Sequence, residues 1–495
     1  MFLPNYFPDS LAKNPFLYPL VEKGLLIHAD LFFAHYISTK EDLSFEAILF
    51  LAFFSAMTRD GHLYVSIINN TLLPSTGNLD DDGVIIQGSI DLPPSIKEKF
   101  FTLKNNCFYF YDHAQAEKNL LFHLDRLEKS CPLPLVHDFN QPHYGLTLEQ
   151  STALNQALAS SFSLICGGPG TGKTFTATVF LRQFIKMFPD AKITVTALTG
   201  KATANLKKSV EHENITGKTL HSLLQETKDI QGFGVRDDDL IIVDESSMID
   251  LIMMSALFSL VKKQCRIVLL GDPNQLPPIG IGNPFEEMIS LFPNKTIMLT
   301  KTLRTDILFI KEISADILAG KTPPYNLLKS FNETVDEITN KFLNISLESF
   351  PSSFCVLTPL KRGLWGSESL NKAIHSRLYE KTASSHKKHP IMVTENRPEI
   401  NVFNGDCGVL DIDKKMMIFE GNKMISSDLI SSFSYNYVTS IHKSQGSEYE
   451  NVLILLPNGC ERFEKKLLYT AVTRAKKHVE IHAVAGLPEA IIKGF

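Results

Sequence analysis

One stretch of eight residues decides the fold: Gly167-Gly168-Pro169-Gly170-Thr171-Gly172-Lys173-Thr174. It fits the phosphate-binding pattern G-x-x-x-x-G-K-[ST], with an apolar run before it and a helical stretch, 174–186, after it. Glycines let the backbone turn its N–H groups around phosphates, and the helix N-terminus adds positive potential there. We expect Lys173 to reach the β- and γ-phosphates of a nucleoside triphosphate, and the Thr174 hydroxyl to hold Mg²⁺.

A second segment, LIIVDE at 240–245, is predicted to be a buried strand that ends in two carboxylates. We expect Asp244 to hold the hydration shell of Mg²⁺, and Glu245 to orient and deprotonate the attacking water. The alternative is that both acids only cap the helix that follows. Together with the phosphate-binding loop (167–174), the segment predicts hydrolysis or transfer of a nucleoside triphosphate.

The composition limits the class of protein. The 495 residues suffice for about three domains, and 44% hydrophobic with 21% charged residues exclude a disordered or fibrous chain. The net charge of −5, from 49 Lys+Arg and 54 Asp+Glu, argues against a protein that coats nucleic acid by bulk charge. Any contact with nucleic acid must come from basic groups gathered in a local groove.

The cysteines and the apolar runs indicate the compartment. None of the seven cysteines lies in a CxxC-type pair, so we expect no structural zinc, iron–sulfur cluster or disulfide framework. The N-terminus lacks the pattern of a signal peptide, and the longest apolar run, 47–57, is too short to cross a bilayer. We therefore expect a cytoplasmic protein without membrane contact.

The order of predicted elements indicates an α/β fold. From residue 146 onward short β-branched runs alternate with helical stretches, which is typical of parallel sheets with crossover helices. Pro323-Pro324 divides this part into two blocks, 146–322 with a short insertion at 225–237, and 323–495 with a small β insertion at about 408–434. The first 140 residues are predicted to form a small helical domain.

Three further segments narrow the chemistry. A Gln at a strand end can contact the γ-phosphate, and Gln275 follows the predicted strand 266–271. Arg304 and Arg474, one from each block, are candidate arginine fingers for a cleft that closes on ATP, although a single Arg is usually a surface residue. The segment SIHKSQGSE at 440–448 is rich in donors suited to nucleotide and sugar-phosphate.

This set of motifs resembles that of superfamily 1 helicases, and most of all the RecD family, the α subunits of exodeoxyribonuclease V (RecBCD). The likeness rests on LTLEQ (146–150), ALTGKA (197–202), TLHSLL (219–224), GDPNQLPPIG (271–280), IHKSQGSE (441–448) and YTAVTRA (469–475). It implies two RecA-like lobes with ATP between them, Gln150 at the adenine, and Gly446 and Glu448 also at the nucleotide.

The resemblance also implies a substrate and partners. Single-stranded DNA would cross both lobes and move 5′→3′, with RecB-like and RecC-like subunits as partners, the N-terminal domain as the partner-binding part, and nuclease activity in a partner. The implied DNA contacts are Thr199, Lys201, His221, Thr439, His442 and Ser444. The alternatives are a stand-alone helicase of the same superfamily, and a P-loop kinase or ATP-gated scaffold without a DNA role.

Overall fold

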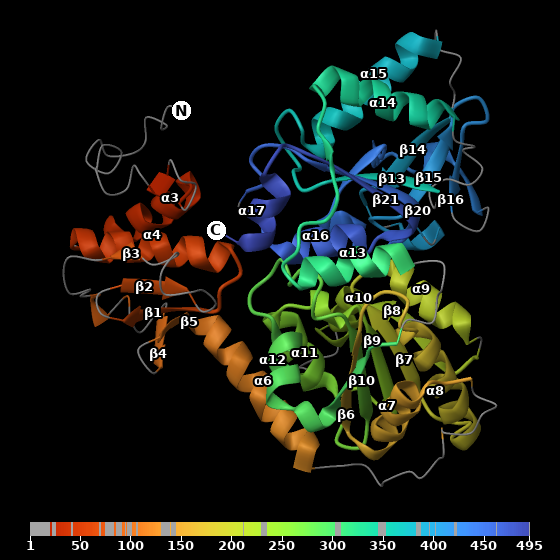
Figure 1. Ribbon diagram of the computed structural model, residues 1–495. Coiled ribbons are helices and arrows are strands. Elements are labelled where there is room, and N and C mark those ends of the chain that lie inside the picture. The colour runs from red at the N-terminus through yellow and green to blue at the C-terminus, as the bar shows by residue number, and fades with distance from the viewer. Residues whose placement is uncertain are drawn as a thin grey trace.

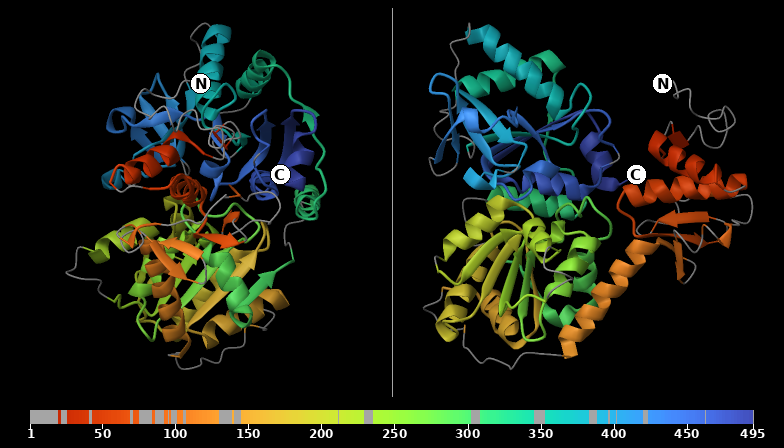
Figure 2. Two further views of the ribbon diagram at one scale, coloured as in Figure 1. Left: turned by 90° about the vertical axis from the view of Figure 1, so that its left-hand side faces the viewer. Right: turned by 180° about the vertical axis from the view of Figure 1, so that it is seen from behind.

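The structure is a computed structural model, and it arranges the chain as two stacked lobes with an N-terminal part beside them (Figures 1 and 2). It describes residues 20–21, 26–40, 43–68, 71–74, 84–85, 92–94, 96, 101–104, 107–129, 139, 145–210, 212–228, 235–301, 308–344, 353–382, 388–395, 397–400, 402–419, 423–461 and 463–494.

Lobe 1 is built on a six-stranded parallel sheet with the strand order β11-β6-β10-β9-β7-β8. Its strands are β6 (Phe162–Gly167), β7 (Ile193–Ala197), β8 (Ile215–Thr219), β9 (Leu240–Asp244), β10 (Arg266–Gly271) and β11 (Thr296–Leu299). Its helices are α7 (Leu148–Ala159), α8 (Lys173–Met187), α9 (Gly200–Ser209), α10 (Leu220–Lys228), α11 (Leu251–Leu260) and α12 (Pro284–Leu291).

Lobe 2 repeats this plan with a five-stranded parallel sheet of order β12-β21-β20-β13-β19. Its strands are β12 (Asn326–Leu327), β13 (Phe354–Thr358), β19 (Val438–Ser440), β20 (Tyr449–Leu456) and β21 (Ala475–Ala483). Its helices are α13 (Leu308–Leu318), α14 (Phe331–Asn344), α15 (Ser367–Thr382), α16 (Lys465–Val472) and α17 (Leu487–Lys493). Helix α13 precedes the predicted boundary at Pro323-Pro324, but it belongs to lobe 2 because its buried isoleucines pack in the core of that lobe.

The apolar runs become these strands because both faces of each sheet are covered. Every residue of β6 and of β10 is buried, and one hydrophobic cluster lies on each face of the sheet in either lobe. Parallel strands that are buried on both faces are expected to be continuously apolar, as these are. The α/β fold class with tandem parallel sheets is therefore confirmed.

The predicted β insertion of lobe 2 is an antiparallel sheet of order β17-β16-β15-β14-β18. Its strands are β14 (Lys388–Val393), β15 (Cys407–Asp411), β16 (Met416–Phe419), β17 (Lys423–Ser426) and β18 (Phe433–Tyr435). The sheet begins earlier in the chain than predicted, because β14 pairs with both β15 and β18. The predicted insertion in lobe 1 includes residues 229–234, which lie outside the described residues.

The N-terminal part contains the predicted helices together with a five-stranded antiparallel sheet, of order β3-β2-β1-β5-β4, that was not predicted. Its helices are α3 (His28–Ser38), α4 (Phe45–Arg59) and α6 (Tyr111–Lys129). Its strands are β1 (Tyr64–Ile68), β2 (Thr71–Pro74), β3 (Val84–Ile85), β4 (Phe101–Lys104) and β5 (Cys107–Phe110). Phe50 and Phe54 of α4 pack on Phe101 and Phe108, which joins helix and sheet in one core.

Helix α6 links this part to lobe 1 by packing along α11 (Figure 1). Arg126 donates to the carbonyl of Val261 at 2.7 Å, and Asn119 donates to the hydroxyl of Ser255 at 2.9 Å. Among the described residues, no helix has the length and apolar character needed to cross a bilayer.

Candidate nucleotide-binding site

The phosphate-binding loop joins the end of β6 to the start of α8, as its pattern predicts. Gly170 and Gly172 have φ angles of 71° and 83°, which are accessible mainly to glycine. The ammonium of Lys173 folds back over the loop and donates to the carbonyl oxygens of Gly167 and Gly168. Lys173 thus already lies where phosphate oxygens would be held.

Gln150 braces this loop from α7. Its side chain is buried, its Nε2 donates to the carbonyl of Thr171 at 3.0 Å, and its Oε1 accepts from the backbone N–H of Thr147 at 3.0 Å. The amide therefore caps α7 and fixes the loop. An adenine contact by Gln150 stays a prediction.

The two carboxylates follow β9 directly. Burial and the neighbouring charge of Glu245 raise the pKa of Asp244, and Glu245 donates its backbone N–H to Asp244 Oδ1 at 2.8 Å. Glu245 has the left-handed backbone angles φ 52° and ψ 38°, a strained conformation for a residue with a side chain. A divalent cation would relieve the repulsion between the two acids, and the oxygen donors of Asp244 and Thr174 suit Mg²⁺.

The loop after β10 presents the predicted phosphate sensor. Asp272 is buried, and its carboxylate accepts from Gln275 Nε2 at 3.2 Å and from the backbone N–H of Asn274 at 3.0 Å. Gln275 Oε1 is buried and accepts no hydrogen bond from the described part of the chain. A buried acceptor of this kind is suited to bind the hydrogen of an attacking water.

Lobe 2 supplies Arg474, which is buried at the end of α16. Its Nε donates to the carbonyl of Thr470 at 3.1 Å, and its Nη1 donates to the carbonyl of Ser447 at 3.2 Å. The neighbouring Glu448 forms an ion pair with Lys476 at 3.3 Å. Arg304 lies outside the described residues.

The two lobes meet through hydrogen bonds beside the nucleotide residues. Tyr469 of α16 donates its hydroxyl to Asp272 Oδ2 at 3.0 Å, and the backbone N–H of Leu276 donates to Thr470 Oγ1 at 2.8 Å. Lys466 pairs with Glu286 of lobe 1 at 2.8 Å. We call this contact the nucleotide-side seam. The sequence motifs contain Tyr469, Thr470 and Asp272, but sequence reasoning assigned them no role.

The loops that are predicted to face DNA meet at a second contact between the lobes. We call it the strand-side seam, after the predicted DNA strand. A Cβ added at Gly446 would lie 3.1 Å from Thr199 Oγ1, and one added at Gly200 would lie 3.2 Å from the ring of Phe403. Phe403 belongs to the loop before β15, so the β insertion touches lobe 1 here. Sequence reasoning missed Phe403, because its contact Gly200 is far away from it in the sequence.

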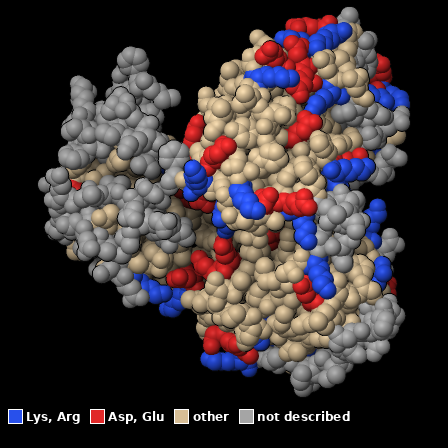
Figure 3. Space-filling view, in the orientation of Figure 1, with Lys and Arg blue, Asp and Glu red and all other residues tan. Residues whose placement is uncertain are grey.

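The six predicted DNA contacts differ in exposure. Lys201 is half-buried and His221 is exposed, while burial lowers the pKa of the half-buried His442. Thr439 and Ser444 are buried, and Ser444 donates to the carbonyl of Ile441 at 2.7 Å. The last two hydroxyls therefore lie beneath the surface, where they support the loops. On the face seen in Figure 1, basic and acidic side chains are interspersed over both lobes (Figure 3).

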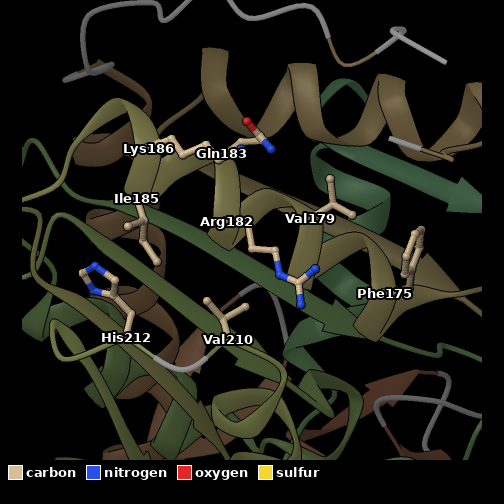
Figure 4. Close-up of a pocket in the computed structure, with 8 residues that line it drawn as sticks. All are labelled: Phe175, Val179, Arg182, Gln183, Ile185, Lys186, Val210 and His212. Carbon is tan, nitrogen blue, oxygen red and sulfur yellow. The ribbon is translucent and has the colours of Figure 1, made fainter. Parts of the chain in front are cut away.

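A cavity of about 530 Å³ lies on the outer face of α8 (Figure 4). It is lined by Phe175, Val179, Arg182, Gln183, Ile185, Lys186, Val210 and His212. None of these is a predicted nucleotide residue, and Phe175 directly follows Thr174 of the phosphate-binding loop.

Among the described residues, Glu337, Glu480 and His482 could share a metal ion, but Lys341 lies 2.8 Å from Glu480 and already neutralises it.

Two family models match the chain: the AAA domain over residues 150–281 and the UvrD-like helicase C-terminal domain over residues 435–481. The RecBCD enzyme subunit RecD of Haemophilus influenzae is 28% identical over 491 residues, covering 76% of this chain and 76% of the relative. The RecD subunit of Buchnera aphidicola from Acyrthosiphon pisum is 27% identical, covering 75% and 79%. The chain belongs to the RecD family of superfamily 1 DNA helicases.

The enzyme class of this RecD-family chain is that of the ATP-dependent DNA helicases. It is also 29% identical to the ATP-dependent RecD2 DNA helicase of Deinococcus radiodurans, covering 67% of this chain but 48% of that relative. The crystal structure of Bacteroides Pif1 bound to ssDNA shares 16% identity with a TM-score of 0.44, covering 70% of this chain and 93% of that one. That likeness is too distant to bear on the site.

Proposed function

We propose that this RecD-family chain is the RecD-like subunit of a RecBCD-type helicase–nuclease, in which it translocates 5′→3′ along single-stranded DNA at the expense of ATP. The observation that carries the proposal is the nucleotide-side seam. It joins the loop that carries Gln275 to the helix that leads to Arg474, and the Tyr469 hydroxyl of that helix would lie 3.0 Å from a Cβ added at Gly168 of the phosphate-binding loop.

The hydrolytic step is assigned to residues of both lobes. Lys173 binds the β- and γ-phosphates, and Glu245 takes the proton of the attacking water that Gln275 orients. Arg474 moves onto the charge that develops on the γ-phosphate. Thr174 and Asp244 would hold Mg²⁺, which when bound would neutralise further charge at the phosphates.

The contacts that move DNA are proposed to lie at the strand-side seam. We propose that Thr199, Lys201 and His221 hold the strand from lobe 1 and that the loop of His442 holds it from lobe 2. Contacts to the sugar-phosphate backbone are sequence-blind and weaken as salt rises. If ATP closes the lobes and hydrolysis releases them, alternate gripping of the strand gives directed steps.

Similarity along most of the chain supports the subunit form. The two RecD subunits are similar to 76% and 75% of this chain, and the RecD2 helicase is similar to 67% of it. We propose RecB-like and RecC-like partners, with the N-terminal part as a docking domain and the nuclease in a partner, acting in the cytoplasm on broken DNA.

An ATPase assay tests the activity. We expect hydrolysis to rise on addition of single-stranded DNA, and Lys173→Ala to abolish it while the variant unfolds at the wild-type temperature. A rate that is indifferent to DNA would instead favour a kinase or an ATP-gated scaffold.

Co-purification from the native cell tests the assembly. Stable association with two larger chains supports the subunit, and a monomer that unwinds DNA alone supports the stand-alone helicase.

A further inference from the structure

We propose that Tyr469 is a positioning residue, through which lobe 2 sets the orientation of Gln275 by way of Asp272. The inference rests on the proposed function and names a further residue for the same hydrolytic site. It arises from a hydrogen-bonded chain that crosses the nucleotide-side seam.

The hydrogen-bonded chain consists of Tyr469, Asp272 and Gln275. The hydroxyl of Tyr469 donates to Asp272 Oδ2 at 3.0 Å, and the same oxygen accepts from Gln275 Nε2 at 3.2 Å. Tyr469 is 3% exposed, Asp272 1% and Gln275 5%, so water does not compete for these bonds. One carboxylate oxygen thus receives one donor from each lobe, and its position depends on both.

The hydroxyl of Tyr469 also lies against the phosphate-binding loop. A Cβ added at Gly168 would lie 3.0 Å from it, and Gly168 is one of the two residues whose carbonyls receive the Lys173 ammonium. Burial and the nearby Asp272 carboxylate raise the pKa of Tyr469, so the phenol keeps its proton and remains a donor.

Helix α16 connects this bond to the arginine finger. The residue after Tyr469 is Thr470, whose hydroxyl accepts from the backbone of Leu276 and whose carbonyl accepts from Arg474. A shift of α16 therefore moves Arg474 and the Tyr469 hydroxyl together. When the lobes part, Asp272 loses the donor from lobe 2 and is free to draw Gln275 away from the position of the attacking water.

This geometry assigns to Tyr469 an effect on the rate of hydrolysis and not on the affinity for ATP. Tyr469→Phe removes only the hydroxyl and keeps the packing of the ring. A hydrogen bond to a charged acceptor contributes enough to change a rate by about tenfold or more. We expect the kcat of DNA-stimulated hydrolysis to fall about tenfold and the KM for ATP to stay within about threefold of wild type.

Tyr437→Phe is the matched control. Tyr437 is also a buried tyrosine of lobe 2, but its hydroxyl lies 2.8 Å from His389 Nδ1, away from the seam. The control should lower thermal stability and keep the wild-type kcat. If Tyr469→Phe keeps the wild-type kcat, or if the control loses as much, the inference is wrong. Wild-type hydrolysis that ignores single-stranded DNA would instead count against the proposed function.

A double-mutant cycle tests the connection through Asp272, and gives an answer from lobe 1 should Tyr469→Phe fold poorly. We expect Asp272→Asn to lower kcat with KM for ATP retained. The double variant should have a kcat no more than about twofold below that of Asp272→Asn alone, because both substitutions break the same hydrogen-bonded chain. Losses that multiply in full would show that the two residues act independently and would overturn the proposal.

Discussion

Gly446→Ala tests whether the strand-side seam couples DNA to hydrolysis. Gly446 has a φ of 73°, so a side chain there costs about 1–2 kcal/mol in backbone strain. Its new Cβ would lie 3.1 Å from Thr199 Oγ1, a contact that must yield by a few tenths of an ångström. Overpacking of this kind costs about 1 kcal/mol when the neighbour can rotate, and it acts only while the lobes are closed. That cost lowers the equilibrium constant for closing about fivefold, and with it the population of a closed arrangement that is the minor species during turnover.

Gly459→Ala is the control for the backbone cost. Gly459 also belongs to lobe 2 and has a φ of 93°, but an added Cβ meets nothing within 4 Å. Both variants should unfold about 2 to 8 °C below wild type. In a steady-state ATPase assay with saturating single-stranded DNA, Gly446→Ala should lose about fivefold in rate, and Gly459→Ala should match wild type. Equal rates for the two variants would refute the coupling.

Three further outcomes are expected. Glu245→Gln should lower the ATPase rate about 10²- to 10⁴-fold while binding of a fluorescent ATP analogue is kept, because only the proton acceptor is lost. Hydrogen bonds from Thr300 lower the pKa of Glu149, so Glu149→Gln should cost about 1 kcal/mol at pH 7 after allowance for exposure. Urea unfolding measures this difference in the free energy of unfolding between wild type and Glu149→Gln. The difference should vanish as the pH falls through the lowered pKa of Glu149, because the carboxylate of the wild type is then protonated as well. Arg126→Ala removes the hydrogen bond from Arg126 to the Val261 carbonyl and so loosens α6 from α11. We therefore expect limited proteolysis to release the N-terminal part faster than from wild type.

The features that follow from local sequence could be predicted. The phosphate-binding loop and its strand are fixed by glycines and an apolar run that adjoin in the chain, and β9 with its two carboxylates is equally local. Parallel sheets follow from the alternation of such runs with helices. These are properties of short segments, and no knowledge of distant contacts is needed to recognise them.

The seams could not be predicted, because their partners are far apart in the sequence. Tyr469 and Asp272 are 197 positions apart, and nothing in either motif names the other. The N-terminal sheet was missed since its strands have between two and five residues, too few for a clear alternation. Gln150 shows a further limit: nothing local in its motif indicated that its amide bonds to the N–H of Thr147 and to the carbonyl of Thr171 in the phosphate-binding loop.

The two contacts between the lobes differ in kind, and this constrains how the molecule can deform. Hydrogen bonds such as Tyr469–Asp272 and Leu276–Thr470 are directional and tolerate little displacement. Close packing of the type seen between Gly446 and Thr199, or between Gly200 and Phe403, permits sliding. A rotation of lobe 2 that is small enough to keep the Tyr469–Asp272 bond therefore displaces the packed contacts more than the hydrogen-bonded ones. A larger rotation, of the kind that parts the lobes, must first break that bond.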